Sequence, residues 1–228
     1  MMKKKDVLGI ELNYDYVRDI YPVVEEYLQD VVMNTIYIVS LTALMETEQN
    51  QEFKDLIAQM DLTLIGEPEI LKAAGLSDRL LENEIKGQIF LKQLFLRALQ
   101  ENKSFFLLAR TEEEIKEMQQ TLENKYGEIM ITNTYAKEKC IGDTDLIVNE
   151  INITSPDILL VKLPTPEMEK FMIEGKEKIS TKLCIGFRTE IYNRMHKRSF
   201  SEWLRRQIRK NTFYRLVTRY RNREIISG

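Results

Sequence analysis

The chain has 228 residues, of which 43% are hydrophobic, and a formal net charge of −3. A chain of this length and apolar content can bury a proper core, which excludes an intrinsically disordered protein and favours a soluble globular fold. No apolar run approaches the roughly 20 residues of a membrane-spanning helix. The basic residues near the amino terminus precede no apolar segment of signal-peptide length. We therefore expect a cytoplasmic protein.

Composition and spacing argue against metal and cofactor chemistry. The two cysteines, Cys140 and Cys184, form no CxxC or metal-ligand spacing, which is typical of reduced structural thiols, and His196 is the only histidine. Asp143 and Asp145 make a DxD pair of a kind that can hold a metal, but they precede a predicted helix, where an N-cap role is favoured. We expect no metal and no cofactor.

Charge is distributed unevenly along the chain. Residues 194–228 contain eleven Lys or Arg and two Glu, a net charge of +9, so residues 1–193 carry −12. Apolar residues four apart in this basic segment, such as Phe213 and Val217, fall on one helix face beside arginines. The pattern is typical of a pair of interfacial helices that lie on an anionic membrane. The predicted membrane-contact residues are Trp203, Arg205, Arg206, Arg209, Lys210 and Phe213.

Two other interpretations of the basic segment stay open. It could dock on the acidic body and complete its core. It could also bind nucleic acid, since basic residues interleaved with aromatic ones serve that purpose. The acidic body would repel a phosphate backbone and no nucleic-acid-binding motif is present, so we expect no nucleic acid. Exposed Phe213, Tyr214 and Val217 would promote association, and we therefore expect a homo- or hetero-oligomer.

Apolar runs rich in β-branched residues alternate with segments of helical periodicity. Thr111 and Glu114 form a capping box at the start of one predicted helix. The alternation predicts a Rossmann-like α/β fold, with a mostly parallel sheet flanked by helices. A boundary near Arg194 divides the chain into a domain over residues 1–193 and a basic amphipathic helical appendage over residues 194–228. Strands are predicted over residues 35–41, 61–65, 104–108, 129–132, 157–163 and 183–187, and helices over residues 16–29, 48–59, 87–100, 111–125, 143–151 and 166–174.

Several segments, in order along nearly the whole chain, resemble one protein family. They are VLGIEL at 7–12, IYIVSL at 36–41, DLTLI at 61–65, SFFLLAR at 104–110, SPDILLVKLPTPEMEKF at 155–171, KLCIGF at 182–187 and FYRLVTRYRNR at 213–223. With these segments the chain resembles the WecG/TagA/CpsF glycosyltransferases. The resemblance implies transfer of a sugar, typically N-acetylmannosamine, from a UDP-sugar to a polyprenyl-diphosphate-linked acceptor. That reaction belongs to cell-surface polysaccharide assembly at the cytoplasmic membrane face, and the family's basic appendage helps to reach the membrane and completes the site.

The resemblance also implies which residues would bind substrate. Ser40 stands where the family has a hydroxyl, Thr42 stands at the family's asparagine, and Pro166 and Glu169 match the family pattern. The substrate-binding candidates on this basis are Ser40, Thr42, Lys170, Arg215 and Arg221.

At the chemically important positions, the chain departs from the family pattern. Gly66-Glu67 stands where the family has Asp-Gly, whose Asp is the proposed general base, and Met168 replaces a glutamine that would contact substrate. Ala109-Arg110 replaces a Gly-Gly loop, and Arg188 interrupts a glycine-containing run. Scaffold positions therefore match while the positions expected to carry chemistry do not.

An inverting sugar transfer needs a carboxylate that deprotonates the acceptor hydroxyl and donors that stabilise the leaving diphosphate. The catalytic candidates are Glu67 and Glu69, which also fit the first turn of a helix. The leading hypothesis is a catalytically inactive glycosyltransferase-fold protein, peripheral at the inner face of the cell membrane, that acts as a partner or regulator of an active homologue. The alternative is an active glycosyltransferase that uses a UDP-sugar.

Overall fold

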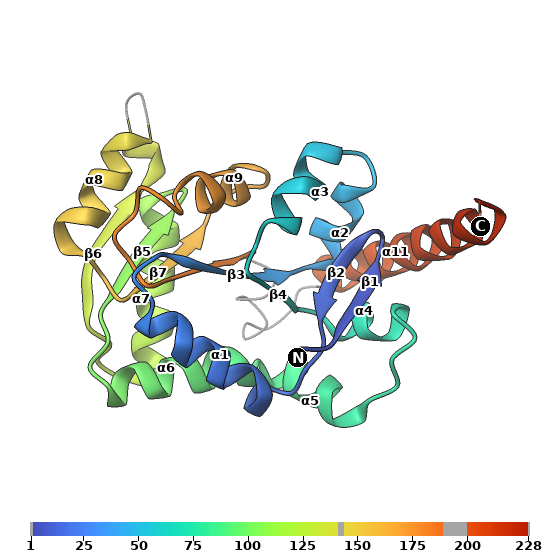
Figure 1. Ribbon diagram of the computed structural model, residues 1–228, viewed down its shortest axis with the longest axis horizontal. Helices are drawn as coiled ribbons and strands as arrows, with labels where there is room; N and C mark the ends of the chain where they lie inside the picture. Colours follow the sequence, from blue (N-terminus) through green and yellow to red (C-terminus); the bar gives the residue numbers. More distant parts are fainter. Residues whose placement is uncertain (1, 141–143, 189–199, 228) are drawn as a thin grey trace.

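The computed structural model describes residues 2–140, 144–188 and 200–227, and within these it contains an eight-stranded sheet with the order β1-β2-β4-β3-β8-β7-β5-β6. Strands β1 and β2 are antiparallel, and every other neighbouring pair is parallel, which confirms the predicted α/β fold with a mostly parallel sheet (Figure 1). The strands are β1 Lys4–Val7, β2 Ile10–Asn13, β3 Asn34–Val39, β4 Leu62–Ile65, β5 Phe105–Ala109, β6 Ile131–Ala136, β7 Ile158–Lys162 and β8 Leu183–Phe187.

Helices cover both faces of the sheet. Alternation along β3 sends Ile36 and Ile38 into one core and Tyr37 and Val39 into the other, because successive side chains of a strand point to opposite faces. Helices α1, α6 and α7 cover the first face, and α2, α3, α8 and α9 cover the second (Figure 1). The helices are α1 Val17–Gln29, α2 Leu41–Thr47, α3 Gln51–Ala58, α4 Pro68–Ala73, α5 Arg79–Gly87, α6 Ile89–Gln100, α7 Glu112–Tyr126, α8 Asp145–Thr154, α9 Glu167–Glu174 and α11 Phe200–Ser227, with a 3₁₀ turn at Lys137–Lys139.

The hairpin β1–β2 was not among the predicted strands. Its turn places Leu8 at φ 59° and Gly9 at φ 76°, the left-handed conformation at both central positions of a type I′ turn. Glycine adopts this conformation without strain, and the Gly9 amide donates a hydrogen bond to Asp6. Leucine rarely occupies the other position, so the turn lacks the usual sequence signal. The hairpin adds β2 to the parallel sheet beside β4.

Several boundaries predicted from the sequence differ from those in the structure. Strand β3 ends at Val39 rather than at residue 41, because the Ser40 hydroxyl accepts a hydrogen bond from the Ala43 amide and starts α2. Strand β6 begins at Ile131 and extends to Ala136, beyond the predicted 129–132. Helix α8 begins at Asp145 after Thr144, which makes no side-chain capping bond, so Asp145 is not an N-cap. The other half of the predicted DxD pair lies outside the described residues.

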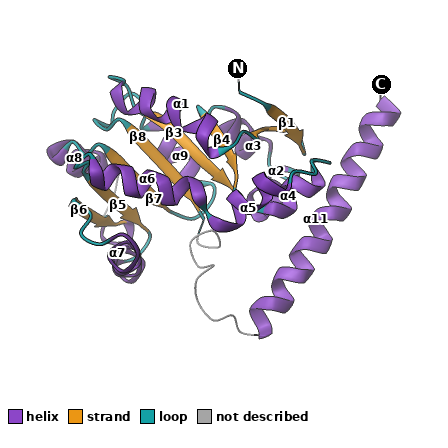
Figure 2. Ribbon diagram, turned by 90° about the horizontal axis from the view of Figure 1, so that it is seen from below, coloured by secondary structure: helices purple, strands orange, loops and turns teal. Residues whose placement is uncertain are grey.

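The basic carboxyl-terminal segment forms a single 28-residue helix, α11, instead of the predicted helix pair. It packs against α2 and α4, and its carboxyl-terminal end extends away from the body (Figure 2). Phe213 is fully buried and Val217 is 6% exposed, and both belong to the core shared with α2, α3 and α4. This face of α11 therefore docks on the acidic body, which is one of the two interpretations that the sequence left open. No helix in the described part of the chain is long and apolar enough to span a membrane.

Candidate functional site

In such a fold, chemistry takes place at the edge where the parallel strands end. In open α/β sheets, ligands bind outside the carboxyl ends of the strands, at the point where the chain switches between the two faces of the sheet. Strand β5 leads into α7 on one face, and its neighbour β7 leads into α9 on the other. The switch point therefore lies between Ala109 and Lys162, which are paired across these two strands.

Glu67 is positioned by the turn after β4 and reaches the start of α2. Its Oε1 atom accepts a hydrogen bond from the Leu41 amide at 3.0 Å, and its side chain is buried, with 6% of the residue exposed. Ser40, also buried, caps the same helix end through the Ala43 amide at 3.2 Å. The predicted site residues Ser40 and Glu67 therefore lie at the same helix end, but each bonds a backbone amide of the first turn of α2.

Glu69 lies two residues further along, in α4, and faces α11. Its carboxylate forms an ion pair with Lys210, and 10% of the Glu69 side chain and 23% of the Lys210 side chain are exposed. Arg209 donates a hydrogen bond to the Thr42 hydroxyl at 3.2 Å. The predicted membrane contacts Arg209 and Lys210 therefore turn toward the body, which corrects their assignment to the outer surface. Phe213 is corrected for the same reason, since its ring is part of the core.

A buried polar chain connects β3, α9, β8 and α2. The Tyr37 hydroxyl donates to Glu169 Oε1 at 2.6 Å, and the Thr165 hydroxyl lies 3.1 Å from the same oxygen. Arg188, at the end of β8, donates to Thr165 at 3.0 Å and to Glu46 at 2.8 Å. Glu169 is fully buried, and its Oε2 atom has no hydrogen-bond partner in the described part of the chain. Burial raises the pKa of the Glu169 carboxyl above its ordinary value.

Carboxylates also occupy the beginning of α7. Glu114 Oε2 accepts from the Arg110 amide at 3.1 Å, and Glu138 Oε1 accepts from the Glu112 amide at 2.8 Å. The Thr111 hydroxyl accepts from the Glu114 amide at 3.2 Å, which confirms one half of the predicted capping box. The other half is corrected, because the Glu114 carboxylate bonds the amide of Arg110 instead of that of Thr111.

The same arrangement recurs at the start of α1. Glu84, on α5, accepts a hydrogen bond from the Val17 amide at 2.9 Å through its Oε2 atom. Helices α1, α2 and α7 all begin at the carboxyl edge of the sheet, where the strands that precede them end. At α1 and α2, the carboxylate accepts the amide of the first helical residue. At α7, Glu138 accepts the amide of the first helical residue, Glu112, and Glu114 accepts that of Arg110, two residues before the helix.

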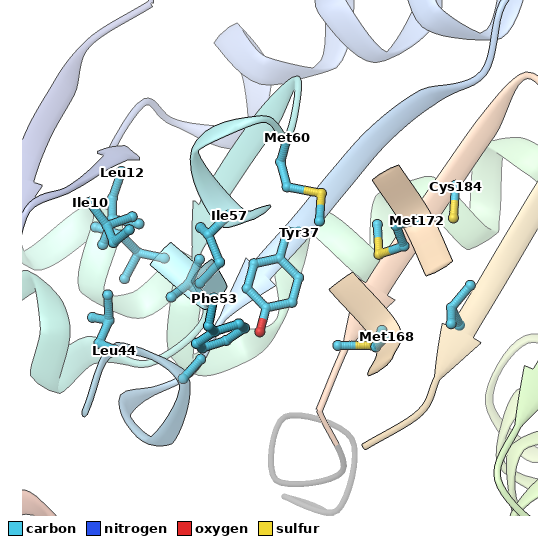
Figure 3. Packing of buried hydrophobic residues seen from close by; sticks show 14 of the residues in the cluster. Ile10, Leu12, Tyr37, Leu44, Phe53, Ile57, Met60, Met168, Met172 and Cys184 are labelled. Atoms are coloured by element: carbon cyan, nitrogen blue, oxygen red, sulfur yellow. The ribbon is translucent and has the colours of Figure 1, made fainter. Parts of the chain in front are cut away.

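Met168 is turned into the core instead of toward the edge. Its side chain is fully buried between α9 and the sheet, next to Met172, which lies beside Cys184 of β8 (Figure 3). A Cβ atom added at Gly186 would lie 2.4 Å from the Met172 sulfur and 3.4 Å from the Met168 sulfur. The two methionines therefore fill the space above a glycine of β8, and Met168 packs hydrophobically.

The remaining predicted residues do not converge on this edge. Lys170 is exposed, pairs with Glu174 at 3.7 Å, and lines a separate cavity of about 450 Å³ between α8 and α9. Arg221 donates to the Ala73 carbonyl, and Arg215 lies on the exposed face of α11. The side chains of Trp203, Arg205 and Arg206 lie outside the described residues. Among the side chains that the structure describes, no group of three or more His, Cys, Asp or Glu could hold a metal.

A smaller cavity opens beside Gly66. It has a volume of about 60 Å³ and lies between the ends of β2, β3 and β4 and helices α1, α5 and α6. Its walls are mostly apolar, with Asn13, Asp15 and Glu84 among its polar residues. Asp15 is engaged by the Lys3 amide at 2.9 Å, and Glu84 by the start of α1. The cavity next to the turn after β4 is therefore narrow, and both of its carboxylates accept hydrogen bonds from backbone amides.

The family model for the glycosyl transferase WecG/TagA/CpsF family matches residues 6–222 of this chain. The chain belongs to this family. The match includes the sheet and most of α11, so the WecG/TagA/CpsF resemblance seen in the sequence is confirmed, and the chain is a glycosyltransferase-like protein of cell-surface polysaccharide synthesis. Among curated proteins, the comparison finds none that matches it.

Sequence reasoning missed three polar side chains of this WecG/TagA/CpsF protein that contact residues distant in the chain. Tyr37, Glu46 and Lys162 were not singled out, although each lies at or near the carboxyl edge. Lys162 carried a signal, because it interrupts the apolar run ILLV of β7 on the same face as Ile158 and Leu160. No sequence pattern marked Tyr37 or Glu46, since the residues that they contact are distant in the chain.

Proposed function

We propose that this chain is a catalytically inactive member of the WecG/TagA/CpsF family that works at the cytoplasmic membrane face as a partner or regulator of an active glycosyltransferase. The observation that carries the proposal is the set of internal glutamates at the starts of α1, α2 and α7. Helix N-termini are the natural binding sites for phosphate groups, because their amides point outward and their dipoles attract negative charge. Here, amides at all three bond carboxylates of the protein itself.

Electrostatics works against a nucleotide diphosphate at this edge. A diphosphate placed at the start of α2 or α7 would lose the amides that Glu67 and Glu114 engage and would approach their negative charges. Displacing either carboxylate would leave it near the incoming anion, and like charges in a partly buried site repel strongly. Leaving-group stabilisation, on which this class of transfer depends, is therefore poorly supported.

The two candidate proton acceptors, Glu67 and Glu69, are also engaged by other groups of the protein. Gly66 has no side chain, Glu67 is committed to the Leu41 amide, and Glu69 is paired with Lys210. A general base must reach the acceptor hydroxyl within hydrogen-bond distance, and both carboxylates are buried against other partners. An active transferase with Glu67 or Glu69 as its base is the alternative, and it would require α4 or α11 to move.

Calorimetry and turnover assays separate the two functions. We expect the full-length protein to bind UDP and UDP-N-acetylmannosamine at no better than about millimolar affinity, and to transfer no sugar to a polyprenyl-diphosphate-linked acceptor in anionic vesicles. The matched variants E67Q and E69Q should leave these results unchanged. Micromolar UDP binding together with turnover that E67Q or E69Q abolishes would establish the active transferase.

A partner role predicts an effect on another enzyme. An active WecG/TagA/CpsF transferase is assayed on vesicles with and without an equimolar amount of this chain. Its rate of sugar transfer should differ between the two assays. The variant F213A removes the buried contact of α11, and it should weaken the effect if the docked appendage is needed for it. An unchanged rate with several active family members would argue against a regulatory partner.

A further inference from the structure

Lys162 is a buried lysine at the switch point of the sheet. It is the last residue of β7, is 3% exposed, and faces α7 because it shares a side of the strand with Ile158 and Leu160. The carboxylate oxygens nearest its Nζ atom are Glu114 Oε1 at 3.6 Å and Glu117 Oε2 at 3.8 Å. Both distances exceed that of a hydrogen bond, and no hydrogen bond to this ammonium is found among the described residues.

The ammonium faces a helix end that is itself positive. The Arg110 amide precedes α7 and points to Glu114 Oε2 at 3.1 Å, while Glu114 Oε1 faces Lys162. One carboxylate therefore bridges the helix start and the buried ammonium. A buried cation beside the positive end of a helix dipole is strongly unfavourable unless an anion lies between them.

Glu114 is better placed than its neighbours to be that anion. Glu117 is more distant, its side chain is 56% exposed, and water screens its attraction to the ammonium. Glu138 engages a different amide, that of Glu112, and reaches it from the turn after β6. The Glu114 side chain is 29% exposed, and among the carboxylates that the structure describes it alone contacts both positive groups.

We propose that Glu114 is a built-in substitute for an anionic ligand, and that it fills an oxyanion site formed by the Lys162 ammonium and the Arg110 amide. The ligand class that fits such a site is a phosphate or diphosphate group, which accepts hydrogen bonds from both donors. The inference rests on the proposed function, which it deepens by naming the residue that blocks the switch point. Removing the Glu114 carboxylate opens the site, and Lys162 supplies its charge.

Titration with inorganic pyrophosphate tests the site directly. The wild-type protein should bind pyrophosphate weakly, and E114A should bind it at least about tenfold more tightly, which corresponds to about 1.4 kcal/mol. E113A is the matched control, because Glu113 is an exposed glutamate in the same helical turn and its loss changes the net charge equally. E113A should bind pyrophosphate as the wild type does, and E114A/K162M should lose the gain.

Thermal unfolding supplies a second readout. E114A leaves Lys162 without its closest counter-ion, so its Tm should fall in phosphate-free buffer and rise again with pyrophosphate, since a ligand that binds only the native state stabilises it. The Tm of the wild type should be insensitive to pyrophosphate. If E114A does not fold, E114Q keeps the side-chain shape, removes the charge, and should show the same direction of change in both measurements.

The outcomes separate this inference from the proposed function. Unchanged pyrophosphate affinity in the folded Glu114 variants, or a gain that persists in E114A/K162M, would overturn the inference. Tight pyrophosphate binding by the wild type that K162M abolishes would overturn it as well, since the site would then be open. Sugar transfer by the wild type would overturn catalytic inactivity, whatever the result with E114A.

Discussion

Glu67 Oε1 accepts a hydrogen bond from the backbone amide of Leu41 at 3.0 Å, and this bond ties the turn after β4 to the first turn of α2. The two residues are 26 positions apart in the chain and belong to neighbouring strand ends. A glutamate that the sequence offers as a proton acceptor is therefore a remote helix cap. Because the Glu67 side chain is buried, water cannot easily replace it as the acceptor for this amide.

Loss of the Glu67 carboxylate should destabilise the fold. E67A leaves the Leu41 amide without this acceptor in a buried position, and we expect the free energy of unfolding to fall by about 1–2 kcal/mol. Urea denaturation followed by circular dichroism measures the change. E52A is the control, because Glu52 lies exposed in the first turn of α3, which Asn50 already caps. Equal stability of E67A and E52A would contradict the cap.

Docking of α11 depends on its buried aromatic ring. F213A removes a fully buried side chain from the contact with the body, and we expect a loss of about 3 kcal/mol or more in the stability of the docked helix. Amide hydrogen exchange of α11 should accelerate while exchange of β3 and β8 stays slow. I208A, in a residue that is 59% exposed on the same helix, should leave exchange unchanged. Slow exchange of α11 in F213A would refute this contact as the anchor.

The Glu69–Lys210 pair should show energetic coupling. Removal of one partner leaves the other charge largely buried, so E69Q and K210M are each expected to cost about 2 kcal/mol, less than for a fully buried pair because both side chains keep some exposure. The double variant E69Q/K210M should recover most of that loss. A double-mutant cycle by urea denaturation measures the coupling, and additive losses would show that the pair contributes nothing specific.

Membrane association is expected to use the face of α11 that points away from the body. Ile208, Arg215 and Arg219 are exposed and lie at spacings of seven and four residues, on one face of the helix. Wild-type protein should be retained by anionic liposomes at low salt and released as salt rises. R215E/R219E should reduce retention at least about tenfold. K92E/K116E, in exposed lysines of α6 and α7, is the charge-matched control. Equal retention by neutral vesicles would contradict an electrostatic surface.

Protonation of Glu169 should shape the dependence of stability on pH. Burial raises its pKa in the folded state, so between the unfolded pKa, roughly 4.3, and the raised folded value, the folded state binds more protons than the unfolded state. Stability contributed by this group is complete below the unfolded pKa and is lost as pH rises through the folded pKa. The stability of the wild type relative to E169Q should therefore decline as pH rises from about 4. A difference that is constant across this range would contradict the raised pKa.

Local patterns were sufficient for the parts of the fold that depend on near neighbours in the chain. The near-continuous apolar runs of β3, β5, β7 and β8 predicted buried parallel strands, and the order of segments predicted the family. The hairpin at Leu8 and Gly9 was not predicted, because leucine is unusual in a left-handed turn position. The docking of α11 stayed open because a basic amphipathic pattern fits a membrane surface and an acidic protein surface equally well.

Residue types alone determined that this chain is an α/β protein of the WecG/TagA/CpsF family with an acidic body, a basic carboxyl-terminal segment and altered residues at Gly66 and Met168. Only the tertiary structure decided which partner each charged group finds. Glu67 reaches α2, Lys210 reaches Glu69, and Glu114 reaches Lys162, across separations of 26, 141 and 48 residues. The physical reason is that strand and helix periodicities are set by residues a few positions apart, whereas hydrogen bonds and ion pairs depend on distances that exist only after the sheet has assembled.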